Sequence, residues 1–368
     1  MEKMSNETKN QATVNSARVM YESAAESALK FQEKLLRGAE MFAALEYDET
    51  NKTPKELVFQ IDKVKLYRYK SKGKVNSTPV LIVYALMNKQ YVMDLHNEKS
   101  FVKKLVESGL DLYIIDWGYP TAEDQYLTTE DYIEEYMGAA IDYILETHKK
   151  PKLNLIGKCQ GGTFSAIYAS MYPEKIKNLI TIAAPFDFDI EDGLLFYWSK
   201  FMNVDLLTNA YSVLPGDFLN NVFIMLSPYN LSVGKYIDVV NNFDDPKALG
   251  EFLRMEKWLF DCPDQAGENY RTWIKELWQE NKLMKGEFYL GDKRIDLKNI
   301  DMPILNIFGS KDNLIPASSS RVFNDLVSSA DKESAEYPVG HAGIVASNLS
   351  QREIVPKIVT WLKERSKK

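Results

Sequence analysis

The sequence predicts a doubly wound α/β fold built on a mostly parallel sheet. Short apolar segments recur along the chain, and 45% of the 368 residues are hydrophobic, which is enough to bury a large core. Helical patterns lie between several of these segments, and in residues 132–148 Ile133 and Ile144 fall on one helical face. Alternation of strand and helix favours parallel strands joined by right-handed crossovers. The expected strands cover residues 58–69, 80–86, 112–117, 153–156, 179–183, 304–308 and 333–337.

The fourth expected strand leads into a cysteine at the position of a nucleophile. Residues 153–166 read L-N-L-I-G-K-C-Q-G-G-T-F-S-A, which is an apolar strand, a sharp turn at Cys159 and a small-residue helix. This order is typical of a nucleophile elbow, with GxCxGG in place of GxSxG. The helix N-terminus favours the thiolate, and the backbone N–H of Gln160 would face an oxyanion beside the sulfur. A cysteine in an apolar context is also commonly a small buried hydrophobe, so the motif needs supporting residues.

The choice of a general base is narrow because the chain has three histidines. His148 lies in E-T-H-K-K at the predicted end of a helix, where a solvated cation complements the helix dipole. His96 follows an M-D-L run in a polar stretch, and a surface or capping role is expected for it. His341 lies between two glycines after a strand-like segment, in Y-P-V-G-H-A-G. An α/β hydrolase places the last member of its catalytic triad in such a loop.

The acidic member of a triad is expected between the cysteine and the histidine. The apolar run P-I-L-N-I-F-G is followed at once by S-K-D-N-L-I-P, so Asp312 lies in a strand-end loop 29 residues before His341. The order Cys159, Asp312, His341 is the hydrolase order. An Asx-turn is the structural alternative for this aspartate. Since all three residues fall on predicted strand-end loops, we expect a Cys-His-Asp triad on an α/β-hydrolase fold.

Six motifs occur together in this chain. They are G-K-C-Q-G-G-T around Cys159, L-M-N-K-Q-Y-V-M-D-L over 86–95, L-P-G-D-F-L-N-N-V-F from Leu214, R-M-E-K-W-L-F-D-C-P-D-Q-A-G-E from Arg254, D-N-L-I-P from Asp312 and V-G-H-A-G around His341. In this combination they resemble the polyhydroxyalkanoate synthases, over residues 55–365. The chain is similar to the short, two-subunit kind, called class III or class IV. It departs from many relatives at Asn313, where they carry His, which leaves the role of that neighbour open.

The resemblance implies an acyltransferase that polymerises short-chain 3-hydroxyacyl-CoA, such as 3-hydroxybutyryl-CoA, into polyester with release of CoA. In the expected mechanism His341 takes the thiol proton and Cys159 attacks the thioester. Backbone N–H groups of Gln160 and of Met87, which follows a strand ending near residue 86, hold the oxyanion. Asp312 orients the histidine, and its action in acylation, in elongation or in both stays open. A Cys-dependent thioesterase or esterase would use the same triad, and a non-catalytic granule-associated protein is the second alternative.

Bulk properties favour a cytoplasmic enzyme. The net charge of -7 argues against nucleic-acid binding, and no continuous apolar stretch reaches the length of about 18 residues that a membrane helix needs. The N-terminal residues lack the apolar core of a signal peptide, and two cysteines make no disulfide framework. The resemblance implies a place at the surface of polyester granules and a small helical second subunit, and homo-oligomerisation is also expected. No metal or cofactor is expected, because CoA arrives on the substrate and is released.

Three regions are predicted. Residues 51–185 and 301–368 form the α/β-hydrolase core, and residues 186–300, far longer than an ordinary connection, form a cap domain over the elbow. The cap holds four of the six tryptophans, so that it can both pack as a small core and shield a thioester from water. Cys262 lies in the cap and is expected to be inert.

Residues 1–50 are predicted to form an N-terminal helical extension. Apolar residues recur there at three- and four-residue steps, as a heptad-like stripe. The stripe is rich in alanine and interrupted by a glycine, which makes a coiled coil of this segment with itself a poor one. It either packs on the core or docks on a partner or a granule surface. The stripe comprises Val14, Ala17, Tyr21, Ala24, Ala28, Phe31, Leu35, Gly38, Phe42 and Leu45.

Overall fold

The computed structural model describes residues 53–70, 78–242 and 245–366, with separate positions between 22 and 40. The chain divides into two compact units, Thr50–Ser227 with Met255–Lys368 and Met1–Glu49 with Pro228–Arg254. The predicted N-terminal stripe lies outside the described residues. The domain boundaries at residues 50, 185 and 300 stay predictions.

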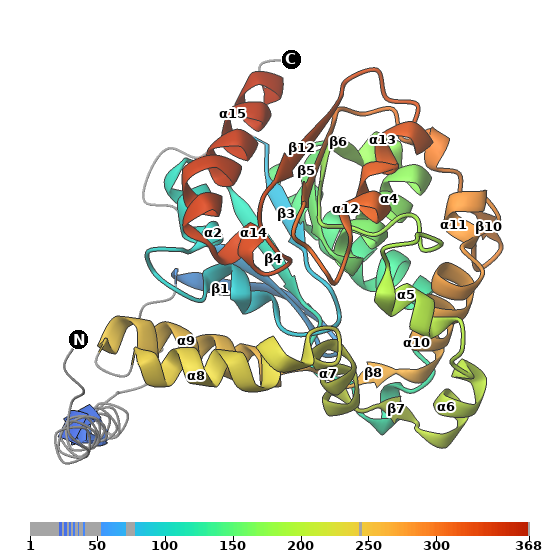
Figure 1. Ribbon diagram of the computed structural model, residues 1–368. Helices are drawn as coiled ribbons and strands as arrows, with labels where there is room; N and C mark the ends of the chain where they lie inside the picture. Colours follow the sequence, from blue (N-terminus) through green and yellow to red (C-terminus); the bar gives the residue numbers. More distant parts are fainter. Residues whose placement is uncertain are drawn as a thin grey trace, which may run out of the picture. The chain divides into compact units, whose positions relative to one another are not determined.

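An eight-stranded sheet in the order β1-β2-β4-β3-β5-β6-β11-β12 forms the centre of the larger unit (Figure 1). β1 pairs antiparallel with β2, and β2 with β4, while the other neighbouring strands run parallel. The predicted mostly parallel α/β sheet is therefore confirmed. The strands are β1 (Lys55–Ile61), β2 (Val64–Tyr69), β3 (Val80–Val83), β4 (Leu112–Asp116), β5 (Leu153–Lys158), β6 (Ile176–Ile182), β11 (Ile304–Gly309) and β12 (Lys332–Tyr337).

Several of the expected strands differ in extent from the observed ones; β6, for example, begins at Ile176, three residues before its predicted start. The prediction of one strand over 58–69 was wrong, because β1 and β2 form a hairpin whose turn contains Asp62 at a φ of 49°. Aspartate tolerates this left-handed backbone, which suits a tight hairpin turn. The strand expected over 80–86 is β3, which ends at Val83, three residues before its predicted end. Residues 84–86 are apolar because they are buried beyond the end of the strand.

Helices cover both faces of the sheet. Leu81 and Val83 of β3 belong to a core shared with α3 and α4, whereas Val80 and Ile82 belong to a second core shared with α2 and α15. Figure 1 shows α2 and α15 on one side of the strands and α4 on the other. Within residues 78–242 and 245–366, the α-helices outside the β6–β11 connection are α2 (Phe101–Glu107), α3 (Gly138–His148), α4 (Gln160–Met171), α12 (Ala317–Arg321), α13 (Phe323–Leu326), α14 (Gly343–Ala346) and α15 (Val355–Ser366).

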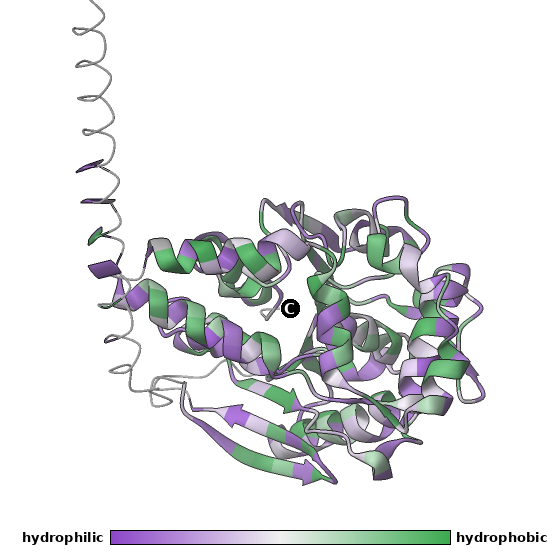
Figure 2. Cartoon of the chain, turned by 60° about the horizontal axis from the view of Figure 1, so that its bottom comes forward, coloured by the Kyte–Doolittle hydropathy of each residue, from purple (hydrophilic) through white to green (hydrophobic). Residues whose placement is uncertain are grey.

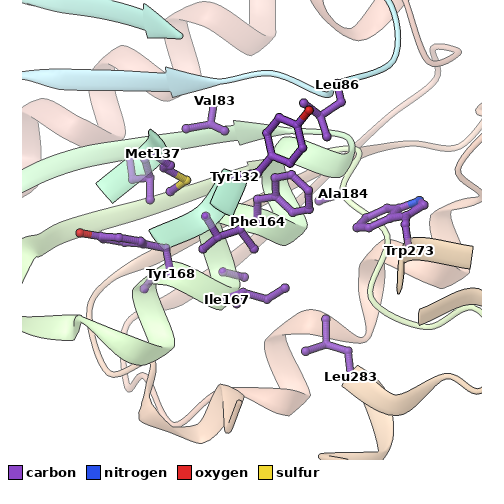
Figure 3. Packing of buried hydrophobic residues seen from close by; sticks show 14 of the residues in the cluster. Val83, Leu86, Tyr132, Met137, Phe164, Ile167, Tyr168, Ala184, Trp273 and Leu283 are labelled. Atoms are coloured by element: carbon purple, nitrogen blue, oxygen red, sulfur yellow. The ribbon is translucent and has the colours of Figure 1, made fainter. Parts of the chain in front are cut away.

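The pattern of hydrophobic residues explains these layers. The helices carry both hydrophobic and hydrophilic residues along their length, as expected for elements with one face on a core (Figure 2). The predicted helix over 132–148 is present as a π-helical segment, Asp131–Met137, that continues into α3. α4 is buried along most of its length, and Figure 3 shows Phe164 and Ile167 from this helix within the first core. Within the described residues, no helix has the length and apolar character needed to cross a membrane.

The connection between β6 and β11 contains most of the remaining helices. One of its aromatic side chains packs directly on α4: the ring centroids of Trp273 and Phe164 lie 5.6 Å apart, edge to face. Within the connection itself, the ring centroids of Trp278 and Phe196 lie 5.1 Å apart, also edge to face. The elements in the larger unit are α5 (Leu194–Ser199), α6 (Val204–Ala210), β7 (Val213–Leu214), α7 (Gly216–Ile224), β8 (Gln265–Ala266), α10 (Gly267–Thr272), α11 (Lys282–Lys285), β9 (Tyr289–Leu290) and β10 (Lys293–Arg294). α8 (Lys235–Asn241) belongs to the smaller unit, and α9 (Pro246–Phe260) runs across the boundary between the two.

The strand order brings four loops to one edge of the sheet. β4 lies on one side of β3 and β5 on the other, so the chain reverses its direction of winding between β3 and β5. In open α/β sheets, ligands bind outside the carboxyl ends of the strands at such a point. The loops that follow β3, β5, β11 and β12 all start at this edge.

A glycine sets how closely α4 approaches the end of β3. A Cβ atom on Gly161 would lie 2.6 Å from the carbonyl oxygen of Tyr84 and would also collide with that of Val83. Both obstacles are backbone atoms, which cannot rotate away.

Gly161→Ala is therefore expected to lower the free energy of unfolding by about 1–3 kcal/mol or more, as overpacking does. Gly138→Ala is the matched control, because its Cβ would meet the nearest side chain at 3.6 Å. That helical substitution should leave stability unchanged or raise it by up to about 1 kcal/mol. Denaturant unfolding of both variants measures the difference, and equal stabilities would contradict the close approach at Gly161.

Candidate active site

Cys159 occupies a sharp turn between β5 and α4. Its φ of 56° and ψ of -131° lie where a residue with a side chain is strained. Its N–H donates to the carbonyl oxygen of Ile182 at 2.9 Å, and its own carbonyl oxygen accepts the N–H of Gly162 at 2.8 Å. Hydrogen bonds on both sides thus hold the strained backbone. The strand, turn and helix have the arrangement of a nucleophile elbow.

Asp312 and His341 meet in the loops after β11 and β12. Nδ1 of His341 lies 2.7 Å from Oδ2 of Asp312, and the aspartate side chain is fully buried. The other carboxylate oxygen, Oδ1, accepts the N–H groups of Leu314 at 3.0 Å and Ile315 at 2.9 Å. Asp312 therefore makes the Asx-type turn that was its structural alternative and also binds the imidazole. The turn fixes the carboxylate, and the carboxylate fixes the ring.

The charges around Cys159 favour its thiolate. Burial by itself raises the pKa of this thiol, but the charge of His341, a hydrogen bond with its ring and the charge of Lys158 outweigh burial and bring the pKa below its usual value. Burial also lowers the pKa of His341, yet the Asp312 carboxylate, aided by Cys159, outweighs burial and raises this pKa to about 9. The cysteine and histidine therefore favour an ion pair at neutral pH.

An apolar cavity lies beside these two residues, with an empty volume of about 540 Å³ that includes space open to solvent. Side chains from the β6–β11 connection and from the strand-end loops form its walls together with Cys159 and His341. Among the other lining residues are Tyr84, Pro185, Leu195, Phe223, Trp273, Trp278 and Ile315.

Both predicted oxyanion donors, Gln160 and Met87, line the same cavity. The backbone N–H of Gln160 interacts with the sulfur of Cys159 and favours its charged form. Oε1 of Gln160 also accepts the N–H of Leu86 at 3.1 Å, which couples the loop after β3 to the elbow. The N–H of Leu86 is thereby occupied. This role of the Gln160 side chain was not predicted, since the motif leaves that position variable.

The end of α9 and the residue that follows it anchor the loop after β3. Nε1 of Trp258 donates to the carbonyl oxygen of Lys89 at 2.6 Å. The carboxylate of Asp261 accepts the hydroxyl groups of Tyr91 at 2.8 Å and Tyr119 at 2.7 Å. These bonds join residues about 140–170 positions apart in the sequence, so local motifs could not have revealed them.

The two other histidines do not line the cavity. Nε2 of His148 lies 2.8 Å from the hydroxyl of Tyr113 and 3.4 Å from a carboxylate oxygen of Asp111, and burial lowers its pKa. The prediction of a solvated cation was therefore wrong for His148. His96 is 8% exposed, so its predicted surface position was also wrong. The prediction for His148 failed because Tyr113 and Asp111, distant in the sequence, lie against its ring.

Cys262 differs electrostatically from Cys159. Burial raises the pKa of the Cys262 thiol to about 11, and this residue is not among those that line the cavity. A buried thiol at neutral pH is a poor nucleophile. In the part of the chain that the structure describes, no group of three or more His, Cys, Asp and Glu side chains is placed to hold a metal ion.

Two family profiles match this chain. One, described as alpha/beta hydrolase fold, covers residues 78–345, and the other, described as Poly-beta-hydroxybutyrate polymerase (PhaC) N-terminus, covers residues 44–105. Among solved structures, a monoacylglycerol lipase from Paleococcus ferrophilus matches with a TM-score of 0.51 at 18% identity, over 82% of this chain and 99% of that one. An esterase from Thermogutta terrifontis matches with a TM-score of 0.50 at 13% identity, over 85% and 99%. These structures support the fold alone.

Curated relatives are much more similar in sequence. The poly(3-hydroxyalkanoate) polymerase subunit PhaC of Synechocystis sp. is 44% identical over 359 residues, covering 95% of each chain. The proteins of the same name from Thiocystis violacea and Allochromatium vinosum are both 42% identical, over 93% and 92% of this chain and over 97% and 96% of theirs. The expected family is thereby confirmed: this chain belongs to the poly(3-hydroxyalkanoate) polymerase PhaC family, on an alpha/beta-hydrolase fold.

Proposed function

We propose that this chain is the catalytic subunit of a poly(3-hydroxyalkanoate) polymerase. It joins short 3-hydroxyacyl units, carried as CoA thioesters, into a polyester and releases CoA. The observation that carries this proposal is the site itself: a cysteine, a histidine and an aspartate on three strand-end loops, with the sulfur and the imidazole open to one apolar cavity. The names of the relatives support the substrate and the product.

In the first step the Cys159 thiolate attacks the thioester carbonyl. The carbonyl oxygen becomes an oxyanion that the backbone N–H groups of Gln160 and Met87 stabilise. The tetrahedral intermediate collapses, the bond to the CoA sulfur breaks, and the imidazolium of His341 gives its proton to the departing CoA thiolate. The acyl unit is then a thioester of Cys159.

In the second step a 3-hydroxyl group takes the acyl unit. Nε2 of His341 accepts the hydroxyl proton, the oxygen attacks the acyl carbon, and Cys159 leaves as a thiolate. The apolar walls, with Phe223 and Trp273 among them, hold an acyl chain and limit the access of water. This exclusion of water favours ester formation over the hydrolysis that a thioesterase would perform.

The proposal extends to partners and location. We propose that the enzyme needs no metal or cofactor, acts with a small helical second subunit, forms homo-oligomers and works in the cytoplasm at the granule surface. Large apolar side chains exposed on and beside α5, α6 and α7 suit contact with an apolar polymer. They are Tyr197, Phe201, Leu206 and Met225.

The direct test supplies the purified chain with 3-hydroxybutyryl-CoA, alone and with the second subunit of a related two-subunit enzyme. We expect release of CoA and growth of a polymer, measured by thiol assay and by sizing of the product. Free 3-hydroxybutyrate without polymer would identify a thioesterase instead. Absence of CoA release in both reactions would favour the non-catalytic alternative.

Cys159→Ala should reduce CoA release by roughly four to six orders of magnitude, as loss of a nucleophile does in triad enzymes. Cys262→Ala should keep most of the activity, because its thiol is protonated and does not line the cavity. Initial rates of both variants, with folding checked by circular dichroism, measure the contrast. Equal losses in two folded proteins would reject Cys159 as the nucleophile.

Asp312→Asn should shift the alkaline limb of the pH profile, where the rate of CoA release falls with rising pH, to lower pH. The carboxylate raises the pKa of His341 to about 9, so its removal lowers this pKa and the imidazolium is lost earlier as the pH rises. If Asp312 acts mainly after acylation, a single turnover still releases CoA but elongation fails. Single-turnover CoA release and polymer length across pH separate these effects.

Asp264→Asn is the matched control for that experiment. Oδ1 of Asp264 accepts the N–H of Gly216 at 2.9 Å, and an asparagine keeps this acceptor. Its pH profile should equal that of the wild type. An unchanged profile in Asp312→Asn would remove this residue from the triad and direct the search to Asp261 and Asp264.

A further inference from the structure

Lys158, the residue directly before the nucleophile, is a buried charge that the mechanism above leaves without a role. It ends β5 and its side chain is fully buried. Its Nζ lies 2.8 Å from Nε2 of His341, the nitrogen that transfers protons in the proposed reaction. Lys89, another buried lysine of this unit, pairs with the carboxylate of Asp116. The direct partner of the Lys158 ammonium is instead an imidazole, which is a base rather than an anion.

We propose that Lys158 is a positioning residue of the acyl transfer: by sharing a proton with His341, it keeps one positive charge beside Cys159 whichever of the two nitrogens holds that proton, and so stabilises the thiolate. The proposal rests on the proposed function, since it assigns Lys158 to the same reaction.

The contact geometry explains why the charge is retained. A nitrogen–nitrogen distance of 2.8 Å has room for one proton between the two atoms. Either the ammonium of Lys158 donates to a neutral Nε2, or an imidazolium donates to the neutral amine. Asp312 binds Nδ1 in both cases. The pair carries one positive charge next to the sulfur whichever nitrogen holds the proton.

The surroundings shift the pKa values of the two bases toward each other. Burial lowers the pKa of Lys158, while Asp312 raises that of His341 despite its burial. The groups that face the ammonium are the Cys159 sulfur at the start of α4, the His341 ring after β12, the Asp312 carboxylate behind it after β11, and the ring of Tyr84 after β3, whose centroid is 5.5 Å away. Burial raises the pKa of Tyr84, so this hydroxyl stays neutral.

A positive charge that is present whenever Cys159 is a thiolate suits a reaction in which this thiolate appears twice in each cycle, first as nucleophile and then as leaving group. In acylation the carbon–sulfur bond to Cys159 forms, the bond to CoA breaks, and the proton of the Lys158–His341 pair leaves on CoA. In elongation the 3-hydroxyl returns a proton to the pair, the ester bond forms, and the bond to Cys159 breaks. Protons and electron pairs balance over the cycle without a further reactant. The charge lowers the energy of Cys159 both as nucleophile and as leaving group.

The test measures how fast iodoacetamide alkylates Cys159 as a function of pH, in a Cys262→Ala background so that one thiol is followed. Lys158→Met should raise the pH at the midpoint of the alkylation-rate curve by about one pH unit or more, as expected for loss of a positive charge beside the thiolate. Lys158→Arg should keep the midpoint near that of the background protein, because it restores the charge. Lys311→Met, which removes an exposed lysine, should leave it unchanged. An unchanged midpoint in Lys158→Met, or equal shifts in the Met and Arg variants, would overturn the proposal.

A second measurement needs no substitution at position 158 and therefore holds even if Lys158→Met does not fold. In the Cys262→Ala protein labelled with ¹⁵N at lysine Nζ, one lysine resonance should titrate at a lower pH than the other lysine resonances. The chemical shift of the same resonance should change when Cys159 is alkylated. If no lysine resonance responds to alkylation, the proposal fails. CoA release by Cys159→Ala, measured in parallel, tests the proposed function separately: activity there refutes that function, whereas an essential Cys159 with a midpoint indifferent to Lys158 refutes this inference alone.

Discussion

The strained backbone of Cys159 is the constraint on which the site depends. A φ of 56° turns the chain from β5 into α4 within one residue, and this turn presents the sulfur to the cavity. Hydrogen bonds to Ile182 and from Gly162 hold the turn, and Gly161 lets the helix approach the end of β3. Strain of this kind costs about 1–3 kcal/mol and persists only where the surrounding structure imposes it. The close packing of sheet and helix thus serves the chemistry as well as the fold.

Burial and neighbouring charges shift the pKa values of Cys159 and His341 in opposite directions, and the effect of the charges is the larger one. An apolar cavity disfavours a thiolate, yet the ring of His341 and the ammonium of Lys158 outweigh burial at Cys159. Asp312 does the same for the histidine, and two backbone N–H groups hold its carboxylate in place. The result is a reactive ion pair in surroundings that suit an acyl chain and exclude water. This combination is what a polymerase needs in order to transfer an acyl group to a hydroxyl.

The sequence was most informative where local pattern determines position. Cys159 and Asp312 lie just after apolar strands, and His341 lies in the loop after a strand-like segment, so the edge of the sheet on which they lie could be predicted from the parallel arrangement. The hairpin at Asp62 was missed because apolar residues continue through both of its strands. His148, Lys158 and the side chain of Gln160 were misjudged or passed over because their partners, Tyr113, His341 and Leu86, come from other loops and strands. Periodicity reports which face of an element is buried, and not what covers it.

The central claim is that an acyl unit resides on Cys159 during catalysis, and mass spectrometry tests it most directly. The wild-type chain would be mixed with 3-hydroxybutyryl-CoA, quenched in acid within one turnover, digested and searched for acylated peptides. The account predicts a 3-hydroxybutyryl adduct on the peptide that contains Cys159, with none on the peptide that contains Cys262. An adduct at another residue, or CoA release with no adduct at any time point, would contradict it.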